Sequence, residues 1–150
     1  MSRRERPEEA FAGMEPALRA AYERIYSREL AARERIFLEY PAYLVAGIPD
    51  HTCRRVATAT VRQWLREKRI FMFLYRWHYW FPVFQFAAGS PKPLVEEVCR
   101  KIQPSNGWQT MYWFVGANGW LEGAAPVDLM DSDPDSVLEA ASHANDLMSD

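Results

Sequence analysis

The side chains in this chain best suited to recognition chemistry gather on one short predicted helix and on the segment after it. Arg62, Gln63 and Arg66 share the outward face of that helix, at spacings that reach base edges and phosphates in a DNA major groove. The full set that we assign to DNA contact is basic or amide-bearing: Arg62, Gln63, Arg66, Lys68, Arg69 and Arg76. The alternative is a solvated basic face on an ordinary amphipathic helix, and charge alone does not separate the two.

Catalytic and metal-binding patterns are weak by comparison. His51 and Cys53 supply two ligands, whereas a structural zinc site needs four, and no second pair is in view. Asp131, Asp133 and Asp135 alternate as in a calcium loop but lack its glycine and late glutamate, so helix capping accounts for them better. The chain has no phosphate-binding loop, dinucleotide fingerprint or nucleophile elbow. We therefore expect a binding protein, not an enzyme, with no catalytic residues, metal or cofactor.

Charge is distributed unevenly along the 150 residues, although the formal net charge is only −2. Residues 51–101 hold ten basic and three acidic residues, whereas residues 102–150 hold eight acidic residues and no lysine or arginine. Such asymmetry favours a basic surface for a polyanion and an acidic surface for a different partner.

Cellular location is inferred from cysteine usage and hydropathy. Only Cys53 and Cys99 occur, too few for a disulfide framework, and no apolar leader follows the basic start of the chain. The most apolar run, 70–86, is too short to cross a bilayer and contains Arg76, His78 and Pro82. These features predict a soluble, cytoplasmic protein without a membrane partner.

Hydrophobic periodicity predicts a long amphipathic helix over 16–40, with proline at its first position. Its apolar stripe packs either on its own domain or on a second copy of the chain. Pro41 ends this helix, and a short helix is expected over 53–56. Thr58 is expected to cap the next helix, 59–68, which carries the basic face.

An aromatic-rich segment after this helix predicts a β-hairpin with strands over 70–75 and 79–86. A loop is expected over 87–93. Further helices are expected over 93–102, over 108–115, from Pro126 and from Pro134, the last of them capped by Asp133.

The fold class that follows is mainly α with a small β-hairpin wing, an α+β protein. A helix-turn-helix or winged-helix-like part precedes a small helical C-terminal domain. The predicted divisions are an N-terminal helical arm over 1–49, a DNA-binding-like region over 50–103 and a partner-binding domain over 104–150.

The segments Val61–Ile70 and Phe81–Phe86 resemble a bacterial family with a reduced helix-turn-helix of the MerR or excisionase kind. In that family a recognition helix is followed by a hairpin that ends in a proline–aromatic–glutamine–aromatic strand. Lys68 and Arg69 stand where the family commonly has a glycine. Further along, a second set of residues resembles the toxin-binding domain of Xre/MbcA/ParS-type antitoxins: Trp113, Asn118, Trp120-Leu-Glu-Gly123, Pro126, Leu129 and Met130.

The resemblance extends over roughly 56–148 and implies two interfaces. The N-terminal part would bind operator DNA as a homodimer and repress transcription, while the C-terminal part would neutralise a cognate toxin of the RES-domain or ADP-ribosyltransferase type. The family motif places the toxin contacts at Trp113, Asn118, Trp120, Leu121, Gly123 and Pro126. The alternative is an orphan or phage-borne protein-interaction module without DNA binding.

Overall fold

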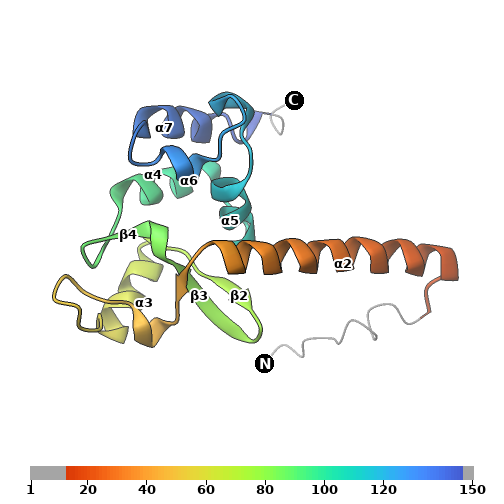
Figure 1. Ribbon diagram of the computed structural model, residues 1–150, viewed down its shortest axis with the longest axis horizontal. Coiled ribbons are helices and arrows are strands. Elements are labelled where there is room, and N and C mark those ends of the chain that lie inside the picture. Colours follow the sequence, from red (N-terminus) through yellow and green to blue (C-terminus); the bar gives the residue numbers. More distant parts are fainter. Residues whose placement is uncertain (1–12, 147–150) are drawn as a thin grey trace. The chain divides into compact units, whose positions relative to one another are not determined.

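The computed structural model describes residues 13–146 and divides the chain into two compact units, with the boundary between Glu39 and Tyr40 (Figure 1). The described part of the first unit consists mainly of helix α2, Pro16–Glu39. This confirms the helix predicted over 16–40, with proline at its first position. Arg19 Nε lies 3.0 Å from Glu23 Oε1, one turn further along the helix.

Apolar side chains on α2 remain accessible. Leu18, Ile25 and Leu30 have exposed fractions of 48%, 62% and 45%, and no residue of the helix is buried. A helix whose apolar residues are accessible gains little stability from burial within its own unit.

The second unit begins with a three-stranded antiparallel sheet in the order β1-β3-β2. Its strands are β1 (Ala42–Tyr43), β2 (Phe73–Tyr75) and β3 (His78–Pro82). Strand β3 is central and ends at Pro82, so the proline, which cannot donate a hydrogen bond to a neighbouring strand, lies at a strand terminus.

The predicted hairpin is present, with shorter strands than expected. Leu74 pairs with Tyr79 and Tyr75 pairs with His78, which leaves only Arg76 and Trp77 in the turn. Both turn residues have positive φ, 47° and 67°, as a type I′ hairpin turn requires. The residues after Pro82 do not extend the strand. They form a 3₁₀ turn, η2 (Val83–Gln85).

Helix α3, Thr58–Arg66, packs its apolar face on the sheet. Val61 and Trp64 are buried in one cluster with Ile48, Ile70 and Phe81. The expected N-cap at Thr58 is wrong: Thr58 is the first helical residue, and the N-cap is Ala57, which has no side-chain oxygen to offer.

The prediction of a short helix over 53–56 is also wrong. The Asp50 carboxylate accepts hydrogen bonds from the Thr52 hydroxyl (2.6 Å) and from the backbone N–H groups of Thr52 and Arg54. The Thr52 hydroxyl bond is the main reason that the pKa of Asp50 lies below its usual value. Cys53 takes a left-handed φ of 63°, and a bridge joins Pro49 to Arg55, so these residues form a closed turn. Before this turn, the only helical segment between β1 and α3 is the 3₁₀ turn η1 (Val45–Gly47).

Two short strands, β4 (Phe86–Ala87) and β5 (Ser90–Pro91), pair antiparallel, so most of the segment expected to be a loop over 87–93 belongs to a small hairpin. Helix α4 follows over Pro93–Ile102, as predicted. The remaining elements are α5 (Gly107–Val115), the 3₁₀ turn η3 (Gly119–Leu121), α6 (Pro126–Leu129) and α7 (Pro134–Ser142).

The last helix begins as predicted, because the Asp133 carboxylate accepts a hydrogen bond from the Ser136 N–H (3.3 Å). Within the second unit, α7 packs against α4, and α6 contacts both α5 and α7. The described residues are thus mainly helical with small antiparallel sheets, an α+β class.

Two further findings concern the organisation of the chain. Residues 42–43, which lie in the predicted N-terminal arm, pair with β3 in the second unit. No helix between residues 13 and 146 combines the length and the apolar character that crossing a bilayer requires.

Candidate functional site

Helix α3 presents its polar side chains on the face opposite its buried residues. Arg62, Gln63 and Arg66 are exposed, whereas Val61 and Trp64 are buried in the sheet-facing core. The rigid packing of Trp64 therefore fixes the direction in which the two arginines project. A short helix held in this way can place guanidinium groups against a polyanion.

The end of α3 is closed by a left-handed cap. The N–H of Lys68 donates to the Leu65 carbonyl (3.1 Å), and the N–H of Arg69 donates to the Trp64 carbonyl (2.9 Å). This is the Schellman arrangement, in which glycine is usual at the position that Lys68 occupies with φ of 56°. A non-glycine residue in the left-handed region costs about 1–2 kcal/mol, so Lys68 stores some strain at the end of α3.

The basic residues around α3 differ in their partners. Arg69 lies 3.7 Å from a carboxylate oxygen of Glu67 and 3.7 Å from one of Glu96, and Gln63 donates to Glu67 (2.9 Å). Within residues 13–146, Arg62 and Arg66 form no ion pair with an acidic side chain. These two arginines therefore carry the positive charge of α3 that is available to a ligand.

The hairpin tip adds a second polar and aromatic surface. Arg76 lies over the Tyr75 ring with its guanidinium carbon 5.2 Å from the ring centroid, a cation–π contact. Trp77 has an exposed fraction of 80% and is held in the left-handed region by the tight turn. The Trp80 indole N–H donates to the Tyr75 carbonyl (3.0 Å), which anchors the base of the tip.

Gln85, in η2, holds the segment before β2 in place, a role that the sequence analysis does not predict. Its side chain is fully buried and forms two hydrogen bonds with the backbone of Phe71. The Phe71 N–H donates to Gln85 Oε1, and Gln85 Nε2 donates to the Phe71 carbonyl, both at 2.9 Å. The amide thus pairs with Phe71 as a neighbouring strand would. The glutamine of the proline–aromatic–glutamine–aromatic pattern was the only sequence signal for this role.

Aromatic stacking connects the hairpin to the C-terminal helices. Phe71 stacks on Phe114 with ring centroids 5.9 Å apart and an interplanar angle of 5°. The Trp108 indole N–H donates to the Leu74 carbonyl (2.8 Å). Residues from the predicted DNA-binding and partner-binding regions therefore share one packed interior.

Most residues assigned to partner binding build the fold around η3. Leu121 and Pro126 are buried. Asn118 is the N-cap of η3, and its side-chain oxygen accepts from the Trp120 N–H (2.9 Å). Gly123 is exposed and lies in a turn with φ of 87°.

Trp120 is the exception, with an exposed fraction of 60%. Its ring stacks on the His143 imidazole at a centroid distance of 3.7 Å and an interplanar angle of 9°. His143 Nδ1 is in turn 2.5 Å from a carboxylate oxygen of Asp146. Trp113 is only half-buried and contacts Phe114 edge to face. The accessible aromatic surface of this region is therefore concentrated at Trp120 and His143.

Acidic residues occur close to this aromatic pair in the sequence. Within residues 102–146 every acidic side chain is exposed: Glu122, Asp128, Asp131, Asp133, Asp135, Glu139 and Asp146. An exposed tryptophan within an acidic region can anchor a basic protein surface. Within the described part of the chain, no group of three or more histidine, cysteine or acidic residues is placed to hold a metal ion.

Comparison of the chain with models of known families, with curated proteins and with solved structures gives no match.

Proposed function

We propose that this protein is a cytoplasmic, antitoxin-like transcriptional repressor that binds operator DNA and neutralises a cognate toxin. In this proposal α3 is the recognition helix of a reduced winged helix, and the β2–β3 hairpin is the wing. The observation that carries it is the pair Arg62 and Arg66, exposed, without an acidic partner among the described residues, and fixed by the buried Trp64.

The charge balance supports DNA as the ligand. Ten basic residues against three acidic ones between 51 and 101 would favour association with a polyanion. Arg76 at the hairpin tip and Lys68 at the end of α3 supply further phosphate contacts in this proposal. Gln63 and Arg69 would exchange their bonds with Glu67 for contacts with DNA.

The experiment compares two double variants in DNA binding across a salt series. Arg62→Ala with Arg66→Ala should weaken binding to the upstream DNA and lower the salt slope by about 2, since each lost phosphate contact removes about 0.9. The matched control, Arg100→Ala with Lys101→Ala, removes the same charge from α4. Equal weakening in both variants would show that binding depends on total charge, and the assignment of α3 would fail.

The proposed toxin surface centres on Trp120 and the acidic residues near it. A RES-domain or ADP-ribosyltransferase toxin with a basic cleft would complement this surface. Trp120→Ala should weaken capture of the neighbouring gene product by at least tenfold, roughly the loss of a central aromatic contact. Trp77→Ala is the control, because it removes an exposed tryptophan at the hairpin tip. Loss with Trp77→Ala and none with Trp120→Ala would contradict this assignment.

A homodimer through α2 completes the proposal. The helix carries five arginines and four glutamates, so its charges can complement those of a second copy, and its apolar stripe is accessible. Sedimentation equilibrium should give a dimer for the natural chain and a monomer for Ile25→Glu. A monomer for both would remove the dimer from the proposal.

One observation favours the second candidate, a protein-interaction module without DNA binding. Between β1 and α3 the structure has a 3₁₀ turn and a closed loop, where a helix-turn-helix has its first helix. If the natural chain binds upstream and random DNA equally weakly while still capturing its protein partner, this second candidate is correct.

A further inference from the structure

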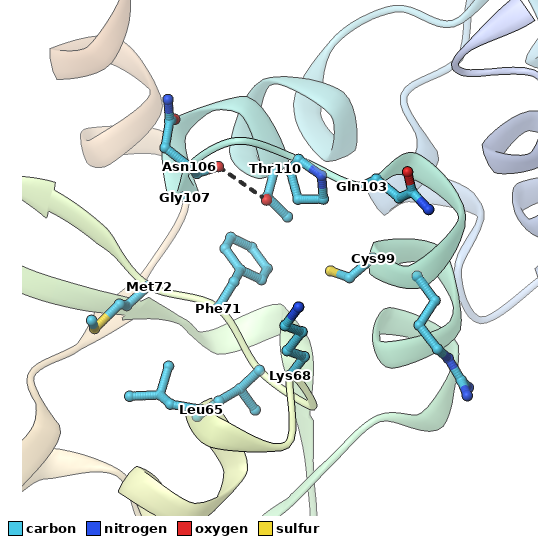
Figure 2. Close-up of a pocket in the computed structure, with 12 residues that line it drawn as sticks. Leu65, Lys68, Phe71, Met72, Cys99, Gln103, Asn106, Gly107 and Thr110 are labelled. Atoms are coloured by element: carbon cyan, nitrogen blue, oxygen red, sulfur yellow. Dashed lines mark hydrogen bonds between the residues drawn. The ribbon is translucent and has the colours of Figure 1, made fainter.

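A cavity of about 570 Å³ lies within the second unit and shares one lining residue, Lys68, with the residues assigned to DNA contact. Its walls come from the end of α3, the segment before β2, the last turn of α4 and the first turn of α5, as Figure 2 shows. A volume of this size falls within the range of small-molecule sites, about 300–1,000 Å³.

One wall of the cavity is apolar and held in place. Leu65, Ile70, Phe71 and Met72 contribute hydrophobic side chains. The Phe71 ring cannot turn freely, because its backbone is bonded to Gln85 and its ring stacks on Phe114. This wall therefore offers a fixed apolar surface to the apolar part of a ligand.

The opposite edge is rigid because the backbone of α5 approaches the segment before β2 closely. A Cβ atom at Gly107 would lie 1.7 Å from the Met72 carbonyl oxygen, so only glycine fits there. Thr110, one turn along α5, is buried, and its hydroxyl donates to the Asn106 carbonyl (3.3 Å), which fixes this side chain in the cavity lining. The cavity is thus formed without a ligand.

The charged groups that line the cavity are both positive. They are Lys68 and Arg100, and no acidic side chain contributes to the lining. Figure 2 shows the side chains of Lys68, Phe71 and Cys99 extending into the same space. Burial raises the pKa of the Cys99 thiol to about 11, so the cysteine is uncharged at neutral pH and does not offset these cations.

We propose that this cavity binds a small apolar molecule that carries one anionic group. The apolar body lies against Phe71 and Leu65, and the anion pairs with Lys68 and Arg100. The ammonium and guanidinium groups remain at the accessible edge, so the ligand can bind without burying an unpaired charge.

Two fluorescent probes that differ in one charged group test the proposal. The anionic probe is 8-anilinonaphthalene-1-sulfonate, and the neutral probe is N-phenyl-1-naphthylamine, which lacks the sulfonate. The natural chain should bind the anionic probe at one saturable site. Lys68→Met with Arg100→Met should weaken this binding about tenfold, the loss of a charge-assisted contact, and leave the neutral probe unaffected.

The control is Arg62→Met with Arg66→Met, which removes two positive charges from the outward face of α3. Equal weakening of the anionic probe in this control, or no saturable binding to the natural chain, would overturn the proposal. Neither measurement uses DNA, so failure of this site is separate from failure of the proposed function.

Thiol protection locates the bound probe. In a Cys53→Ser background, alkylation of Cys99 by iodoacetamide, followed by mass spectrometry, should slow at least fivefold when the anionic probe saturates, because Cys99 lines the cavity. An unchanged rate would place the probe elsewhere, such as on the apolar stripe of α2, and would overturn the proposal.

A final consequence rests on the proposed repressor function. Lys68 lines this cavity and is also assigned to DNA contact, so the anionic probe should weaken operator binding. If the probe binds in the cavity and DNA affinity is unchanged, the ligand site stands and Lys68 is removed from the DNA surface.

Discussion

The α3 surface and the segment 118–126 use their assigned residues in opposite ways. On α3, the side chains of Arg62, Gln63 and Arg66 are exposed, and the residues between them form the core. In 118–126, Leu121 and Pro126 are buried, and contact with a partner is left mainly to Trp120. Substitutions on α3 should therefore change binding with little effect on stability, whereas most substitutions in 118–126 should change stability first.

The largest expected effect is a loss of stability in the region that contains α3 and the hairpin, at a residue that is buried there. Gln85→Leu should lower the free energy of unfolding by about 2–6 kcal/mol, because the N–H and carbonyl of Phe71 would each lose a buried partner. Gln63→Leu is the matched control on an exposed site, with an expected change within about 0.5 kcal/mol. Urea denaturation measures both, and equal small losses would show that water replaces the Gln85 amide.

Leu121→Ala is expected to be nearly as damaging. Its side chain is buried, so truncation should cost about 2–5 kcal/mol of unfolding free energy, measured by the same denaturation. Leu38→Ala on α2, where the exposed fraction is 77%, should change stability by no more than about 0.5 kcal/mol. If the Leu121→Ala variant is as stable as the natural chain but fails to capture its partner, Leu121 is a partner-binding residue and not mainly a structural one.

Asn118→Ala should have an intermediate effect. The side chain accepts a hydrogen bond at the start of η3, and loss of such a cap costs about 1 kcal/mol. Asn118→Asp retains the acceptor and should retain most of the stability. If both variants are equally destabilised in thermal unfolding, the cap is not the reason that asparagine is needed.

Lys68→Gly should give the smallest change in the free energy of unfolding, and it should raise stability where the other substitutions lower it. Glycine relieves the left-handed strain at the end of α3, so the free energy of unfolding should rise by about 0.5–1 kcal/mol. DNA affinity should fall slightly, because one phosphate contact is lost. Lys68→Ala loses the charge and keeps the strain, which separates the two contributions. A glycine variant that is less stable than the alanine variant would refute the strain argument.

Sequence patterns predicted the elements whose signals are local. Prolines at the first helical positions marked α2, α4, α6 and α7, and the spacing of Val61 and Trp64 gave both the buried and the outward face of α3. The exposure of Arg62 followed directly from that periodicity.

Features that depend on distant partners were missed. The bonds between Gln85 and Phe71 join residues fourteen positions apart, and the proline–aromatic–glutamine–aromatic pattern that contains Gln85 does not identify Phe71 as its partner. The turn that replaces the expected helix over 53–56 forms because the Asp50 carboxylate captures N–H groups that a helix would have used. Motif matching selected Leu121 and Trp120 together, although only the folded chain separates the buried residue from the exposed one.

The most direct test of the proposed function is the affinity of the natural chain for its own upstream DNA across a salt series. The proposal predicts sequence-selective binding, tighter than binding to random DNA of the same length, with an affinity that falls steeply as salt rises. Equal, weak binding to both DNAs at every salt concentration would contradict it. Trp120 and its acidic surroundings would then be the main functional surface left.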